Sequence, residues 1–120
     1  MARGPSLEGK THGAPSGESA ETPSARVGTR LLHEDDFRRV WLLDLDPGEA
    51  TEWHQHDSDY VFVVTQSGVV RTEYADGSTE TQDGDDLGHA EYRQRDTPHR
   101  LVNVGDHPYG NVVIELKPRH

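Results

Sequence analysis

Between residues 40 and 117, apolar residues alternate with polar ones in one short run after another. This period of two limits the possible folds more than any other feature. Glycine, aspartate, asparagine or proline separates most of the runs, and no segment has a helical period. The runs cover residues 40–46, 50–56, 60–66, 69–74, 79–82, 87–93, 99–104 and 111–117. About eight short strands at this spacing predict an all-β sandwich or barrel. Asp76-Gly77, between two alternating runs, predicts a tight hairpin.

Composition divides the chain of 120 residues into a tail and one domain. Residues 1–28 are rich in glycine, proline and serine, with no aromatic residue and no apolar periodicity. Such a segment buries too little apolar surface to offset its ordering entropy. We therefore predict a disordered tail over residues 1–28 and a folded domain over residues 29–120. This domain is small enough that we also expect it to form a homodimer, through an edge strand.

The net charge of −10 excludes some partners. The charges of the first 28 residues cancel, so the whole excess lies in the folded part. An acidic body repels phosphate, and we therefore expect no nucleic-acid or anionic-membrane partner. The sequence has no cysteine, no apolar stretch long enough to span a membrane and no signal-peptide pattern. These features fit a cytoplasmic protein.

Two histidines stand one residue apart, directly before an apolar run. Positions i and i+2 of a strand share a face, so His54 and His56 project to the same side, where two imidazoles can bind one divalent ion. Asp57 and Asp59 have the opposite parity. A His-x-His pair alone is weak support for a metal site, because exposed strands often carry paired polar residues.

The wider pattern resembles the two signature motifs of the cupin superfamily. Gly48 lies six residues before His54, and His99 opens a late strand with Asn103 four residues beyond it. The stretches TEWHQHDSDYVFVV and HRLVNVGD are most similar to small bacterial cupins of the β-alanine-degradation type. The resemblance implies a double-stranded β-helix, which is a jelly-roll barrel closed around a pocket.

The same resemblance implies a metal site. By analogy with cupins, His54, His56 and His99 would hold a divalent ion, with Fe, Zn, Mn or Ni left open. The glutamate that cupins usually place after the second histidine is absent, because Tyr60 and Val61 occupy those positions. Tyr60 shares parity with the two histidines and is the candidate catalytic acid or weak ligand. Glu91 is the alternative carboxylate.

The remaining polar residues have less specific interpretations. Phe62 and Val64 are expected to line the core or the pocket wall. Arg71 and Glu73 share a face, which is either a substrate-binding surface or a solvated ion pair. Asn103 is predicted to stabilise a turn rather than to take part in catalysis.

These observations favour a small metal-dependent enzyme. Its substrate would be a small carboxylate- or carbonyl-bearing molecule, and isomerase, lyase and dioxygenase chemistry all suit the superfamily. A non-catalytic sensor or carrier that uses the same pocket is the main alternative. A structural role with a vestigial site is the third.

Overall fold

A computed structural model describes residues 24–83, 86–95 and 97–118. The described residues form strands and contain no helix long and apolar enough to cross a membrane. The strands are β1 (Arg30–Glu34), β2 (Arg38–Leu45), β3 (Tyr60–Gln66), β4 (Val69–Tyr74), β5 (Thr79–Asp83), β6 (Ala90–Arg93), β7 (His99–Asn103) and β8 (Tyr109–Leu116).

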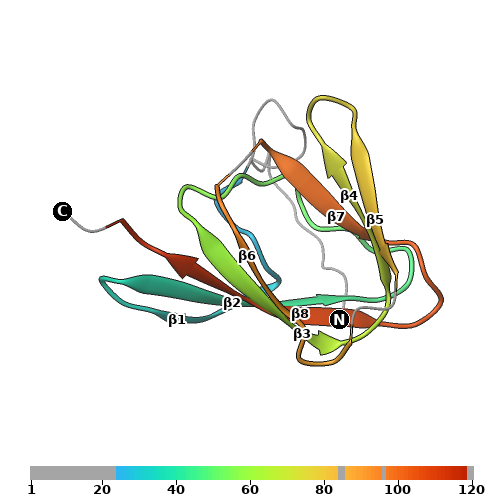
Figure 1. The fold of residues 1–120 in the computed structure, drawn as a ribbon, viewed down its shortest axis with the longest axis horizontal. Helices are drawn as coiled ribbons and strands as arrows, with labels where there is room; N and C mark the ends of the chain where they lie inside the picture. Colours follow the sequence, from blue (N-terminus) through green and yellow to red (C-terminus); the bar gives the residue numbers. More distant parts are fainter. Residues whose placement is uncertain (1–23, 84–85, 96, 119–120) are drawn as a thin grey trace.

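The strands form two antiparallel sheets that face each other (Figure 1). The larger sheet has the order β1-β2-β8-β3-β6, and the smaller one the order β5-β4-β7. The β1–β2 hairpin extends beyond the smaller sheet in this view. This arrangement confirms the all-β fold of the jelly-roll type that the alternating pattern predicted.

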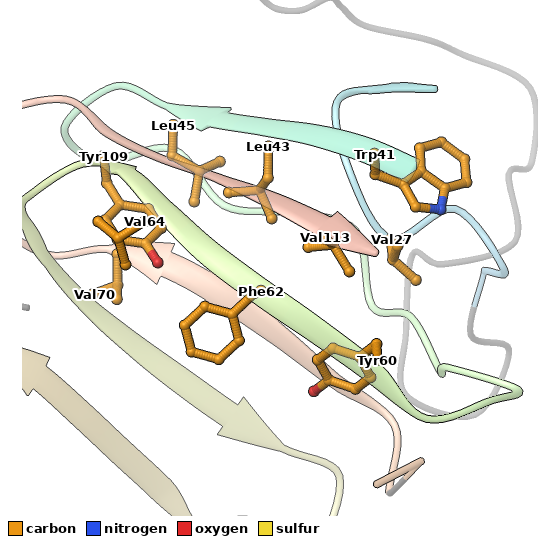
Figure 2. Packing of buried hydrophobic residues seen from close by; sticks show 10 residues of the cluster. All are labelled: Val27, Trp41, Leu43, Leu45, Tyr60, Phe62, Val64, Val70, Tyr109 and Val113. Carbon is orange, nitrogen blue, oxygen red and sulfur yellow. The ribbon is translucent and has the colours of Figure 1, made fainter. Parts of the chain in front are cut away.

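Strand β8 is central because it pairs with β2 on one side and β3 on the other. Alternate residues of β8 are buried, as the period of two requires. The inward-facing side chains of β2, β3 and β8 meet between the sheets and form the core (Figure 2). The buried apolar residues are Val27, Trp41, Leu43, Leu45, Tyr60, Phe62, Val64, Val70, Tyr109 and Val113. Phe62 and Val64 are therefore core residues, as expected.

Strand β1 did not appear among the predicted strands. Its residues, RLLHE, place two leucines side by side, so the sequence shows no alternation. All five residues are exposed, and the register with β2 shifts between Leu31 and His33. An edge strand exposed on both faces carries no burial pattern to detect.

The predicted strand over residues 50–56 is instead an extended segment with isolated bridges. Ala50 pairs with Val102, and His54 pairs with His99, both antiparallel. Between them Thr51 N–H donates to the Leu101 carbonyl at 2.9 Å, whereas Leu101 N–H donates to the Thr51 hydroxyl at 3.0 Å instead of to a backbone carbonyl. The ladder is therefore interrupted, although the segment still runs along β7.

The domain begins earlier than composition predicted. Val27 is only 1% exposed, and Ser24 forms a parallel bridge with His54. At Gly28 a Cβ atom would lie 2.7 Å from the Cβ of Trp41, so this close approach requires glycine. Val27 and Ser24 thus pack against the barrel on the N-terminal side of the boundary predicted at residue 28. The predicted disorder of residues 1–23 concerns a segment outside the described residues.

Two turns match their sequence signals. Gly77 has a φ of 91° in the β4–β5 hairpin, where Tyr74 N–H bonds to the Ser78 carbonyl, as the Asp-Gly pair predicted. Asn103 donates hydrogen bonds to the carbonyls of Leu45 and His107, at 2.9 and 2.8 Å, and accepts one from Gly105 N–H. The structural role predicted for Asn103 is therefore confirmed.

Candidate metal centre

The structure brings the three predicted histidines together. His54, His56 and His99 are 3%, 4% and 7% exposed. Their ring centroids lie 4.5 to 5.3 Å apart. One ring nitrogen from each residue lies within 4.8 Å of the other two, and no other histidine, aspartate or glutamate of the described residues belongs to this cluster. Residues 43 positions apart therefore form one compact site.

Backbone pairing fixes two of the three ligands. His54 and His99 exchange two backbone hydrogen bonds of 2.8 and 2.9 Å, which places their side chains next to each other. Ser24 holds the opposite edge of this segment, where its N–H bonds to Trp53 and its carbonyl accepts from Gln55. The His54 backbone is thus held between β7 and the N-terminal segment.

Each histidine has an oxygen acceptor near its Nδ1 atom. His54 Nδ1 lies 2.9 Å from the Glu52 carbonyl, and His99 Nδ1 lies 3.0 Å from the Thr97 carbonyl. A carbonyl oxygen only accepts, so these Nδ1 atoms carry the protons. His56 Nδ1 lies 3.3 Å from Oε2 of Glu115, in a geometry looser than a straight hydrogen bond. Bonding of this kind leaves each Nε2 lone pair for a metal ion.

Glu115 adjoins the histidine cluster and was not among the residues that the sequence predicted. Its side chain is 1% exposed, at the inward end of β8. Trp41 Nε1 and Arg39 Nη1 donate to its Oε1 atom at 2.9 and 3.1 Å. The alternation of the sequence NVVIELK could have indicated it, because Glu115 has the same parity as Asn111 and Val113 and so shares their inward face. A carboxylate at a core position of a central strand requires partners.

Burial affects the charge of the site in two ways. It lowers the pKa of His54 to about 3, with further contributions from the nearby His99 and His56. Burial alone would raise the pKa of Glu115, but hydrogen bonds from His56 and Trp41 outweigh it and lower that pKa. At neutral pH the cluster therefore contains a neutral His54 ligand beside an ionised carboxylate.

Tyr60 lies in the site, but its ring does not simply replace the absent glutamate. It stacks on the His56 ring, with centroids 3.7 Å apart and an angle of 13° between the planes. Tyr60 and Phe62 project from the same side of β3 (Figure 2). The Cα of Tyr60 pairs with that of Glu115 across the sheet, so both residues adjoin His56 from neighbouring strands. Tyr60 therefore helps to fix the orientation of the second histidine.

A cavity between the two sheets contains the histidine cluster. Its wall combines the three histidines with apolar and polar side chains, namely Val27, Leu43, His54, His56, Tyr60, Phe62, Thr72, Tyr74, Gln82, Arg93, His99, Leu101, Tyr109, Asn111 and Val113. The free volume is about 60 Å³. One water needs roughly 10–15 Å³ on this measure, so the space suits an ion with a ligand of a few atoms.

Other polar side chains adjoin or avoid this cavity. Arg93 lines the wall, and its Nε donates to Oε2 of Glu91 at 2.5 Å. Glu91, the alternative carboxylate, is thus paired with Arg93 and lies outside the metal cluster. Arg71 and Glu73 form a 2.7 Å ion pair away from the cavity wall, which supports the interpretation as a solvated pair.

The eight-stranded antiparallel fold and its buried histidines define a small cupin-type barrel. A search of solved structures found a cupin domain from Bordetella pertussis Tohama I that is 27% identical, with a TM-score of 0.67 over 74% of this chain and 91% of that one. No protein-family model matches the sequence, and no curated protein matches it.

Two further solved structures share the fold at lower identity. A sugar phosphate isomerase of the cupin superfamily from Silicibacter pomeroyi is 21% identical, with a TM-score of 0.51 over 69% of this chain and 52% of that one. The cupin-2 domain of an XRE-family transcriptional regulator from Enterobacter cloacae is 24% identical, with a TM-score of 0.53 over 68% and 83%. The described residues therefore share the fold of cupin domains, and the similarity to the Bordetella pertussis domain supports a place in the cupin superfamily.

Proposed function

We propose that the protein is a metal-dependent cupin enzyme that acts on a small carboxylate- or carbonyl-bearing molecule. The ion, which is Fe, Zn, Mn or Ni, is held by His54, His56 and His99. The observation that carries this proposal is the buried cluster of the three imidazoles, in which one ring nitrogen from each lies within 4.8 Å of the others and each Nδ1 has an oxygen nearby. When bound, the ion supplies a Lewis acid that polarises the substrate oxygen.

The spacing of the donor atoms supports an ion of this size. Zinc binds imidazole at about 2.0–2.1 Å, so two nitrogens on one ion lie at most about 4.2 Å apart. The donor atoms here lie within 4.8 Å of one another, and small side-chain rotations bring them to that separation. Three neutral ligands leave open coordination positions, as catalytic metal sites require.

Arg93 supports an anionic substrate. Arg93 lines the same cavity as the histidines, and a planar guanidinium binds a carboxylate by paired hydrogen bonds. Asn111, 4% exposed, also lines the wall. Its amide donates to the Tyr109 hydroxyl at 3.0 Å, and its buried Oδ1 has no hydrogen-bond partner within the described part of the chain. That oxygen suits a donor group on the same ligand. Tyr60 is the proposed proton donor, because it lies beside the cluster in the cavity.

A non-catalytic sensor or carrier is the second candidate. The solved structures that share the fold include a protein named as an isomerase and a domain of a transcriptional regulator. Both kinds of role are thus named on this fold, so the fold does not select between them. The polar groups around the cluster favour the enzyme, since a purely structural cavity has no need for Arg93 beside a buried imidazole set.

Metal content tests the proposed site. We expect the purified wild-type protein to bind about one equivalent of divalent ion, and His54→Ala and His99→Ala to lose it. His107→Ala is the matched control, because the side chain of His107 is 80% exposed and lies outside the cluster. Unchanged metal content in both cluster variants would overturn the three-histidine site.

Turnover separates the enzyme from the binding module. The metal-loaded protein would be incubated with a panel of small carboxylic and keto acids, with oxygen consumption and product formation recorded. Thermal stabilisation by an acid without any product would favour the sensor or carrier.

A cytoplasmic location and the absence of nucleic-acid and membrane partners belong to the same proposal. For these points it rests on the charge and composition of the chain.

A further inference from the structure

The three histidines differ in the group that adjoins Nδ1. His54 and His99 use backbone carbonyls, which are neutral, whereas His56 faces the carboxylate of Glu115. That carboxylate is almost completely buried behind the cluster and is oriented by Trp41 and Arg39. Its two oxygens have separate partners, with Oε1 accepting from Trp41 and Arg39 and Oε2 facing His56.

We propose that Glu115 is a positioning residue for the metal. It holds the proton of His56 on Nδ1, aims Nε2 at the ion, and supplies through His56 the negative charge that the missing fourth ligand would provide. This inference rests on the proposed metal site. It assigns the compensating charge to the far end of the chain, on β8, rather than to Tyr60 or Glu91.

The physical reason lies in the tautomers of imidazole. A ligand histidine must present a lone pair to the metal, and its other nitrogen must then donate to an acceptor. A carboxylate acceptor makes the ring a stronger donor toward the metal than a carbonyl does. The Arg39 guanidinium, 21% exposed, also bonds to Glu34 of β1, and it keeps the buried carboxylate compensated.

Glu115→Gln is the sharpest substitution because glutamine has the same shape. If its amide oxygen accepts from Trp41 and Arg39, its NH₂ group faces His56 Nδ1, which must then accept. That arrangement moves the ring proton to Nε2, where it blocks the ion. If the amide turns the other way, the donors of Trp41 and Arg39 lose their partner. Either orientation breaks a contact that the carboxylate satisfies.

The experiment is a competition of each metal-free protein against a fluorescent zinc chelator. We expect Glu115→Gln to weaken zinc affinity by roughly 10- to 100-fold, the range typical when the acceptor behind a ligand histidine is removed. Glu34→Gln is the matched control, because it removes the other carboxylate bonded to Arg39 without touching His56. This control should stay within about twofold of wild type.

A second measurement does not depend on the variant being folded. Long-range ¹H–¹⁵N correlation spectra of the metal-free wild-type protein report which nitrogen of His56 is protonated, and we expect Nδ1. A proton on Nε2 would overturn the inference, as would equal zinc affinity of the wild type and a folded Glu115→Gln. Failure of the proposed function has a different signature, since the wild-type protein itself would then not bind zinc.

Discussion

At the scale of single residues, Tyr60 has two proposed roles, and one substitution can distinguish them. Its ring stacks on His56, while its hydroxyl is the proposed acid. Tyr60→Phe keeps the ring and removes the hydroxyl, so zinc affinity should remain within about threefold of wild type while turnover falls by roughly 10²–10⁴-fold, the usual contribution of general acid catalysis.

The measurement is kcat on whichever acid the screen identifies, alongside the zinc competition. Val61→Ala is a suitable control because Val61 lies next to Tyr60 in β3 but does not line the cavity. Unchanged kcat in Tyr60→Phe would remove Tyr60 from the reaction. A large loss of zinc affinity would instead make the hydroxyl part of the metal site.

His54 gives the metal-free protein a pH-dependent stability. Its pKa is about 3 in the folded state, and an imidazole in the unfolded chain titrates near its ordinary value of 6.5. Between these values the unfolded state binds a proton that the folded state excludes, so the free energy of unfolding falls as pH falls. Above pH 6.5 the burial of His54 does not reduce the stability through protonation. Below pH 6.5 it lowers the free energy of unfolding by up to about 1.4 kcal/mol per pH unit.

Urea unfolding of the EDTA-treated protein at pH 7.5 and pH 5 measures this effect. The midpoint should drop more in the wild type than in His54→Gln, which has no titrating group at this position. Equal drops in the two proteins would contradict the prediction, because carboxylates elsewhere contribute to both.

At the scale of elements, the connection after β7 depends on one amide. Asn103 is 1% exposed and makes three hydrogen bonds that tie β7 to the end of β2 and to the following turn. Asn103→Ala leaves these backbone groups without their partner, and we expect a loss of about 2–3 kcal/mol in the free energy of unfolding.

Denaturant unfolding checks the value, with the half-exposed Val104→Ala as the control in the same turn. A change below about 0.5 kcal/mol would mean that water replaces the amide. Because Asn103 touches neither cavity nor cluster, its variant should still bind zinc when folded.

Elements with one buried face could be predicted from sequence, and others could not. Strands β3 and β4 have the predicted bounds, since their alternation records one face against the core. Strand β1 has no buried face and left no pattern. The segment over residues 50–56 alternates correctly for His54 and His56, yet Glu52, of the same parity, is exposed, because isolated bridges do not maintain a regular pleat.

The residues of the site could likewise be predicted only where the sequence carries a recognisable pattern. The three histidines were found because their spacing is a motif, whereas Glu115 has no motif and becomes visible only when β8 is placed beside His56. The burial of Val27, which lies in the segment predicted as a tail, was not visible in the sequence for a related reason. Composition averages over many residues and does not register that a single valine fills a gap in the core.

At the scale of the whole molecule, we propose that two copies associate through β1. It is the edge of the larger sheet, and Leu31 and Leu32 are 42% and 44% exposed there. An edge strand with unpaired backbone groups and apolar side chains favours association with another edge. A second copy is the simplest occupant, since an isologous contact needs only this one surface.

Light scattering after size exclusion should then give twice the chain mass of 13.4 kDa. Leu31→Lys should shift the protein toward monomer. Leu87→Lys is the control, because Leu87 is 72% exposed and precedes β6, at the opposite edge of that sheet. A monomeric wild type, or a dimer that both variants leave intact, would exclude this surface.

The N-terminal segment has a practical consequence for shortening or fusing this protein. Val27 lines the cavity, and the backbone of Ser24 pairs with that of His54. A chain trimmed to begin at Thr29 would keep the described strands and the three histidines, but part of one wall of the cavity would be missing. Such a trimmed protein should fold with a looser site, and weak zinc binding by it would be mistaken for a property of the histidines themselves.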